Sequence, residues 1–322
     1  LMSLIGDSEP NGKFNTAIGY KSMMDATGGN DNIAVGHQSL LKNTSGSKNI
    51  ALGNYALSAN TTGNVNVSLG YESLLNNTSG DYNTAIGNYS LHENTEGEKN
   101  TAIGVDSLYN VITGNNNVAV GYKAQYLSNS TFNTSVGDDT LAQIESSEDS
   151  SYNTAIGFNS LNRLKTGGTN IAMGYNTLSN AVNSEFNIGI GYSALKTLSV
   201  ANSNAGSANI AIGTKAMHDV SGGTSNVGIG TDAMYNRIDG SSNFGIGTQS
   251  MYNQSGGTSN FGIGTEALHN GNGGTGNFGI GTKAMHDQSG GTSNFGIGTE
   301  ALHSANEGLE NFGIGTKAMY DL

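Results

Sequence analysis

The stretch NTAIGNYSL, residues 83–91, decides the fold, because close variants of it recur along the whole chain. It contains a glycine, Gly87, that follows an alanine and an isoleucine, and glycines in this setting occur eighteen times. We call them the motif glycines and number each repeat from them, with the glycine at position 0. All but three of their spacings are 17 residues, and the exceptions are 16, 20 and 22. The motif glycines are Gly19, Gly36, Gly53, Gly70, Gly87, Gly104, Gly121, Gly137, Gly157, Gly174, Gly191, Gly213, Gly230, Gly247, Gly264, Gly281, Gly298 and Gly315.

Several other positions keep one residue type from repeat to repeat. Position −1 is aliphatic or Met, position +3 is Ser, Ala or Thr, and position +4 is Leu or Met except at Gln125. Position −4 is Asn without exception, which predicts a structural ladder of stacked side chains. Its members are Asn15, Asn32, Asn49, Asn66, Asn83, Asn100, Asn117, Asn133, Asn153, Asn170, Asn187, Asn209, Asn226, Asn243, Asn260, Asn277, Asn294 and Asn311.

The repeat length predicts an all-β fold, a parallel β-solenoid or β-roll of about eighteen coils. A unit of 17 residues is too short for a helical hairpin repeat, which needs about 33. Glycine also costs roughly 1 kcal/mol in a helix interior. A short unit with few apolar atoms can bury them only against the coils above and below it. With strands about 4.8 Å apart, eighteen coils would give a rod on the order of 85 Å long.

Each column of the repeat has a predicted role. The Asn side chains at −4 would bond to one another from coil to coil, and the motif glycine would occupy a corner with positive φ. The Ile and Leu columns at −1 and +4 are predicted to form the interior. The small residues at −2 and +3 are predicted to allow close approach by another surface.

Composition excludes several classes of function. The chain has 49 glycines among 322 residues, and only 35% of its residues are apolar, too few for a large globular core. Its formal net charge is −12 and it has no basic patch, which disfavours nucleic acid as a partner. No stretch approaches the roughly 20 apolar residues of a membrane-spanning helix, so we expect no membrane insertion. Cysteine is absent, so disulfides do not hold the fold together.

The repeats resemble the head repeats of trimeric autotransporter adhesins, and similar repeats occur in phage tail fibres. The stretches that carry the resemblance are Asn15–Gly19, Asn83–Gly87, Asn100–Gly104 and Asn153–Gly157, with variants in the other coils. The resemblance covers roughly residues 14–322 and implies a left-handed β-roll that forms a homotrimer. The adhesin repeat is shorter than this one, and the extra residues here fall in the polar return between coils.

The chain is predicted to fall into four segments: an N-terminal segment or degenerate coil (1–13), coils of the Ala-Ile-Gly type (14–196), an insertion loop (197–208) and coils of the Phe-Gly-Ile-Gly-Thr type (209–322). In the last segment Gly replaces Ala beside each Phe. We interpret this as compensation of volume, in which a column without side chains makes room for a column of large ones. Irregular stretches at 122–132, 142–152 and 197–208 are predicted to be loops that bulge from the solenoid.

The chain offers few candidates for chemistry. Position +5 holds five of the six histidines, His92, His218, His269, His286 and His303, and Tyr109, Tyr235, Tyr252 and Tyr320 share the column. No column of carboxylates or cysteines completes a metal site, so we predict an aromatic column at a surface or an interface, with metal binding and sugar contact as alternatives. Asn43, Asn60 and Asn77 fit the N-glycosylation triplet. The Gly-Gly pairs lack the Asp of calcium β-rolls, and no set of catalytic residues stands out. The sequence therefore predicts no enzyme, no cofactor and no metal.

The sequence favours a non-enzymatic structural or adhesive fibre outside the cell, an adhesin head or filament rod at a cell or virion surface. A bacteriophage tail-fibre shaft or receptor-binding fibre is the alternative, and an ice-binding solenoid with a Thr column is a remote one. The expected partners are further copies of the chain, in a homotrimer or stacked end to end because the last coil has no cap, and a host-cell or matrix surface.

Overall fold

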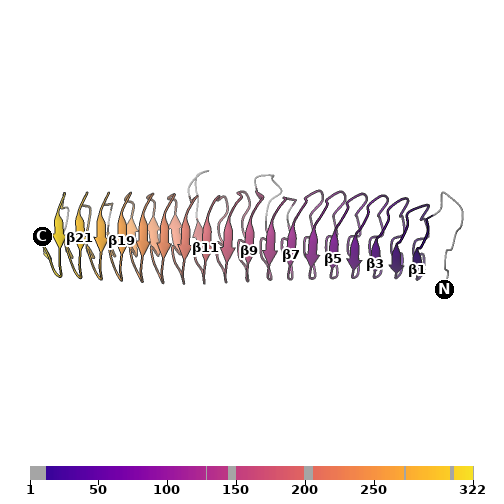
Figure 1. The fold of residues 1–322 in the computed structure, drawn as a ribbon, viewed down its shortest axis with the longest axis horizontal. Helices are drawn as coiled ribbons and strands as arrows, with labels where there is room; N and C mark the ends of the chain where they lie inside the picture. The colour runs from indigo at the N-terminus through magenta and orange to yellow at the C-terminus, as the bar shows by residue number, and fades with distance from the viewer. Residues whose placement is uncertain are drawn as a thin grey trace. The chain divides into compact units, whose positions relative to one another are not determined.

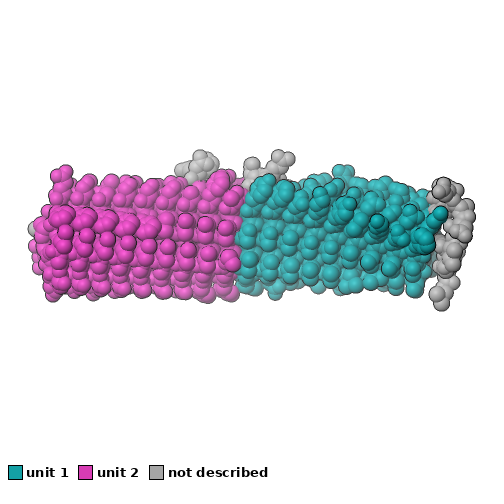
Figure 2. All heavy atoms as spheres, viewed as in Figure 1, with its two compact units in different colours: residues 1–158 teal, residues 159–322 magenta. Residues whose placement is uncertain are grey.

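The fold was analysed in a computed structural model that describes residues 12–127, 129–143, 150–198, 206–271, 273–304 and 308–321. These residues form an all-β structure without an α-helix. The chain divides into two compact units, residues 1–158 and 159–322 (Figure 2). The boundary falls within the coils of the Ala-Ile-Gly type rather than at the change of repeat near residue 200.

In unit 1 the described residues contain nine short strands, one in each coil (Figure 1). They pair in parallel and in register, so that Thr84 lies opposite Thr101 and Ile86 opposite Ile103. The strands are β1 (Thr16–Ile18), β2 (Ile33–Val35), β3 (Ile50–Leu52), β4 (Val67–Leu69), β5 (Thr84–Ile86), β6 (Thr101–Ile103), β7 (Val118–Val120), β8 (Thr134–Val136) and β9 (Thr154–Ile156).

Unit 2 repeats this arrangement and adds a second, smaller sheet. Nine strands in its described part form the same parallel ladder: β10 (Ile171–Met173), β11 (Ile188–Ile190), β13 (Ile210–Ile212), β15 (Val227–Ile229), β17 (Phe244–Ile246), β19 (Phe261–Ile263), β20 (Phe278–Ile280), β21 (Phe295–Ile297) and β22 (Phe312–Ile314). Four more strands pair in parallel on the polar return: β12 (Thr197–Leu198), β14 (Asp219–Ser221), β16 (Asn236–Ile238) and β18 (Asn253–Ser255). The predicted parallel β-solenoid is confirmed.

The core is made of different columns from those that the sequence predicted. In a strand alternate side chains face opposite sides, so the buried Asn at −4 puts position −2 inside and positions −3 and −1 outside. Ala85 and Leu91 are fully buried, whereas Ile18 is 48% exposed and Ile103 38%. The prediction that the Ile column lies in the interior is wrong. The small residues at −2 and +3 are buried, so they face the Leu column within the coil and not another surface.

The Gly-for-Ala exchange in unit 2 also has a different cause from the predicted one. The Phe residues occupy position −3, so their side chains point outward. The glycines occupy position −2, which faces inward. A Cβ on Gly245 would lie 3.0 Å from Cγ of Met234, and one on Gly262 would lie 3.1 Å from Cγ of Met251. Gly245 and Gly262 therefore make room for a buried methionine at +4, and not for the Phe column.

The motif glycine occupies the predicted corner. Gly87 has φ +135°, and a Cβ there would lie 2.4 Å from the carbonyl oxygen of Gly104 in the next coil. The residues at positions +2 and +4 also take the left-handed conformation although they are not glycine. After Gly53 these are Tyr55, at φ 61°, and Leu57, at φ 53°. Such residues cost roughly 1–2 kcal/mol each. Here the cost is offset because Tyr55 N–H donates to His37 O and Leu57 N–H to Ser73 O, in the two neighbouring coils.

The irregular stretches are described only in part. At 122–132 the described residues keep the path of a coil: Gln125 replaces Leu at +4, points inward and is fully buried. Its Nε2 donates to Asn117 Oδ1 over 3.0 Å, so the predicted bulge is absent there. Residues 144–149 and 199–205, which carry most of the other two predicted loops, lie outside the described residues.

Candidate functional site

The Asn ladder at position −4 binds successive coils together, mainly through the backbone. Oδ1 of Asn49 accepts the backbone N–H of Asn66 at 2.9 Å. Nδ2 of Asn49 donates to the carbonyl of Gly63 in the polar return at 2.8 Å. A direct bond between side-chain amides is added in only some coils, as from Asn66 Nδ2 to Asn49 Oδ1 at 3.2 Å. Each Asn thus satisfies buried backbone groups of the strand and of the return.

Unit 1 contains a second buried ladder that the sequence analysis missed. It lies at position +7 and consists of Asn43, Asn60, Asn77 and Asn94, all fully buried. Nδ2 of Asn77 donates to Asn60 Oδ1 at 2.9 Å and to the Gly80 carbonyl at 3.1 Å. The recurrence of Asn three residues before the late glycine was the signal for it.

This ladder overturns the glycosylation hypothesis. Asn43, Asn60 and Asn77 carry the triplet, but their amide nitrogens are buried and hydrogen-bonded. Attachment of a glycan to Nδ2 would require this part of the coil to open.

The outer strand face exposes a row of large apolar side chains within each unit. We use this name for positions −3 and −1 of the strands, which alternate with the buried positions. In unit 1 its most exposed members are Ile18, Ile33, Leu69, Ile103, Val118 and Val136. In unit 2 they are Ile171, Met173, Ile212, Phe312 and Ile314, beside a stack of Phe rings whose centroids are 4.8–4.9 Å apart. Apolar patches of this extent mark interaction sites.

An aromatic belt runs along the corner of unit 1 just after the motif glycine. Each ring contacts the next, with centroid separations between 4.8 and 6.4 Å. Its members are Tyr20, His37, Tyr55, Tyr71, Tyr89, His92, Tyr109 and Tyr126. Around Tyr71 the contacts are edge-to-face, with interplanar angles of 86° and 79°. Tyr71 is 37% exposed, so part of its ring is accessible to a partner.

Carboxylates along the belt change the chemistry of its rings. A hydrogen bond to Glu72, followed by burial, raises the pKa of Tyr71 to about 12. Burial, followed by the charge of Glu93, raises the pKa of Tyr109. His92 lies between carboxylates of Glu93 (2.8 Å) and Glu72 (3.3 Å). Tyr71 and Tyr109 therefore stay protonated as hydrogen-bond donors at neutral pH.

Unit 2 has a ring stack at position +5 in which neighbouring rings are nearly parallel. Centroids are 4.8–5.2 Å apart, with interplanar angles of 2–20°. The stack comprises His218, Tyr235, Tyr252, His269, His286, His303 and Tyr320. Burial, and then the neighbouring His286, lower the pKa of His269, which favours the neutral imidazole.

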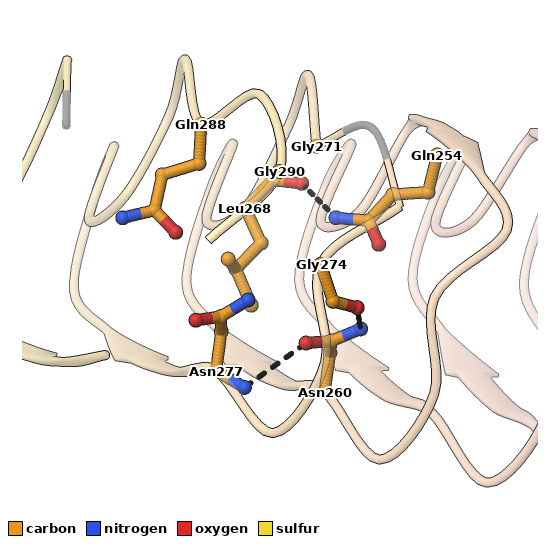
Figure 3. A pocket seen from close by; sticks show the side chains of 8 residues that line it. All are labelled: Gln254, Asn260, Leu268, Gly271, Gly274, Asn277, Gln288 and Gly290. Carbon is orange, nitrogen blue, oxygen red and sulfur yellow. Dashed lines mark hydrogen bonds between the residues drawn. The ribbon is translucent and has the colours of Figure 1, made fainter. Parts of the chain in front are cut away.

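A small cavity lies inside unit 2 where the column at +7 is interrupted by Gly271 (Figure 3). Its volume is about 10 Å³, and Gln254 and Gln288 flank it. Gln254 Nε2 donates to the Leu268 carbonyl at 2.7 Å. Both amide atoms of Gln288 are buried without a hydrogen-bond partner, so this part of the interior is imperfectly satisfied.

Comparison with protein-family models and with curated proteins finds no match to the chain. Among the residues that the structure describes, no helix is long and apolar enough to cross a membrane.

Proposed function

We propose that the chain is a non-enzymatic structural and adhesive fibre, located outside the cell on a cell or virion surface, that assembles as a parallel homotrimer. The observation that carries the proposal is the outer strand face. Its position −1 is aliphatic or Met in every coil, and its position −3 is Ile, Val or Phe except for threonine in five coils of unit 1. Because this pattern repeats with the coil, identical faces on parallel copies would match rung by rung.

Other features of the molecule support the same proposal. The interior of a coil is thin, because positions −2 and +3 hold only small residues, and association would bury apolar area that a single chain leaves in water. Trimerisation is also what the resemblance to adhesin head repeats implies.

The test places charge on the outer strand face and compares it with equal charge beside it. Ile86→Asp with Ile103→Asp adds two carboxylates to the face, whereas Asn88→Asp with Val105→Asp adds two at exposed corner positions. Ile103 and Val105 are 38% and 42% exposed, so exposure alone does not distinguish them. Sedimentation equilibrium should show a trimer for the wild type and the corner variant, and smaller species for the face variant. Equal masses for the two variants would contradict the proposed interface.

The adhesive part of the proposal concerns the aromatic belt of unit 1. Tyrosines supply large contact area with little loss of side-chain entropy and keep a polar group at the rim. Tyr55→Asn with Tyr89→Asn should reduce retention on immobilised extracellular-matrix protein, because Asn occupies the same position at Asn159 and Asn176 and the coil should tolerate it. Tyr175→Asn with Tyr192→Asn in unit 2, at position +1 where Asn54 and Asn88 stand in unit 1, is the control. Retention equal to that of the wild type would remove the belt as the contact surface.

A further inference from the structure

The histidine stack of unit 2 brings a carboxylate next to two imidazoles, which the sequence analysis did not foresee. His286 and His303 are stacked with centroids 5.0 Å apart and an interplanar angle of 9°. In the described part of the chain, one donor atom from each of these histidines and one from Asp287 all lie within 4.8 Å of one another.

The nitrogen atoms of both rings are oriented alike. Nδ1 of His286 lies 2.9 Å from Oδ1 of Asp287, and Nδ1 of His303 lies 3.0 Å from the Ser304 hydroxyl. Both Nδ1 atoms therefore face the column at position +6, from which the Asp287 carboxylate projects. Asn270 Nδ2 donates to that carboxylate at 2.9 Å and so orients it.

The opposite edge of His286 is also supported. Its Nε2 lies 3.4 Å from a carboxylate oxygen of Glu266. Histidines that bind metals commonly donate their other ring N–H to a carboxylate, which fixes the tautomer and directs the lone pair at the metal. With the proton on Nε2, the lone pair of His286 is on Nδ1, on the side of Asp287.

We propose that His286, His303 and Asp287 bind a divalent transition-metal ion of the Zn²⁺ or Ni²⁺ type. Imidazole nitrogen and carboxylate oxygen suit such ions, with bonds of about 2.0–2.2 Å. The three donor atoms lie within 4.8 Å of one another. Rotation of their side chains would have to bring them together by on the order of 1 Å. The His286 side chain is 16% exposed, so water can reach the ion and complete its coordination.

Other coils of the stack supply matched comparisons. His218 has a neighbouring carboxylate, Asp219 at 3.0 Å, but stacks on Tyr235 instead of a second histidine. His269 has a histidine neighbour, but Asn270 stands where His286 has Asp287. Tyr and Asn are thus natural occupants of positions +5 and +6, and the substitutions His303→Tyr and Asp287→Asn should leave the coil folded.

The experiment is calorimetric titration of the full chain with ZnCl₂ at pH 7.5, with thermal melting to verify that each variant folds. The wild type should bind one ion per chain, and His303→Tyr and Asp287→Asn should each weaken binding ~10-fold or more. His218→Tyr should bind as the wild type does. Zinc should also shift the imidazole NMR resonances of His286 and His303 and leave that of His218 in place.

Three outcomes would overturn the proposal. They are the absence of saturable binding to the wild type, unchanged binding by both His303→Tyr and Asp287→Asn, and loss of binding on His218→Tyr. Because none of these readouts depends on trimer formation, the metal site and the proposed function can fail separately.

Discussion

Among the differences between the two units, one lies at position +7 in the polar return. In unit 1 it holds the buried ladder of Asn43, Asn60, Asn77 and Asn94, and the return of these coils contains no strand. In unit 2 it holds Leu198, Val220, Arg237 and Gln254 in the four strands of the second sheet. The polar return of the 17-residue coil can therefore be stabilised either by hydrogen bonds of buried side-chain amides or by backbone pairing between strands.

At the end of the second sheet the polar return has neither a continuous amide ladder nor continuous strand pairing. Beyond β18 the column continues with Gly271 and Gln288, and the cavity forms there. Buried polar groups without partners are destabilising. We therefore expect this part of unit 2 to be less stable than the coils of unit 1.

The largest effect is expected at the motif glycines, which the two units share. Gly264→Ala would place a Cβ 2.5 Å from the Gly281 carbonyl oxygen at φ +134°. The free energy of unfolding should fall by at least ~3 kcal/mol, and Gly87→Ala in unit 1 should behave alike. Denaturant unfolding followed by circular dichroism measures both variants.

A glycine in the left-handed region without a close neighbour shows the cost of that backbone conformation alone. Gly256 has φ +73°, and a Cβ there would meet no atom within 4 Å. Gly256→Ala should cost only ~1–2 kcal/mol. A cost as large as that of Gly264→Ala would show that the close approach between coils is not what demands glycine.

The next effect is expected in the ladder at −4, which is also common to both units. Asn260 Oδ1 accepts the backbone N–H of Asn277 at 3.0 Å, and its Nδ2 donates to the Gly274 carbonyl at 2.7 Å. Asn260→Ala should leave these buried groups unpaired, at ~1–3 kcal/mol each. Asn253→Ala, at an exposed position, should melt close to the wild type. Equal melting temperatures for the two variants would contradict the ladder.

The smallest effects test position +7 and should have opposite signs in the two units. Asn77→Leu removes the bonds to Asn60 and Gly80 and should destabilise unit 1 by ~1–3 kcal/mol. Gln288→Leu removes two unpartnered buried atoms and should stabilise unit 2 by about 1 kcal/mol. Thermal denaturation of both variants measures the signs. If Gln288→Leu is as harmful as Asn77→Leu, the two units do not differ as described.

The sequence predicted the coil, its period and its parallel stacking, because these follow from the spacing of Gly and Asn alone. It did not predict which side of the strand faces inward. Ile is more apolar than Ala, so composition favoured Ile86 over Ala85 for the core, whereas the period-2 alternation from the buried Asn83 settles the matter. In a thin coil the small side chain fits inside and the large one remains outside.

The candidate sites were harder to predict for a physical reason. The distance between Asp287 in one coil and His303 in the next depends on the path of the chain through a corner with left-handed residues such as Lys283 and Met285. That corner brings Asp287 toward His286 and His303, and a scan for columns of one residue type did not detect a single carboxylate. The +7 ladder was missed because its Asn residues resembled a surface glycosylation pattern.

The mass of the assembled protein tests the central claim, that the outer strand face is an interface between copies. The chain has a mass of 33.1 kDa, so a homotrimer has a mass of three times 33.1, or 99.3 kDa. Native mass spectrometry or sedimentation equilibrium at micromolar concentration should give that value. The circular dichroism spectrum of the same sample should show that the protein is folded. A stable, folded species of 33.1 kDa that persists as the concentration rises would contradict the account.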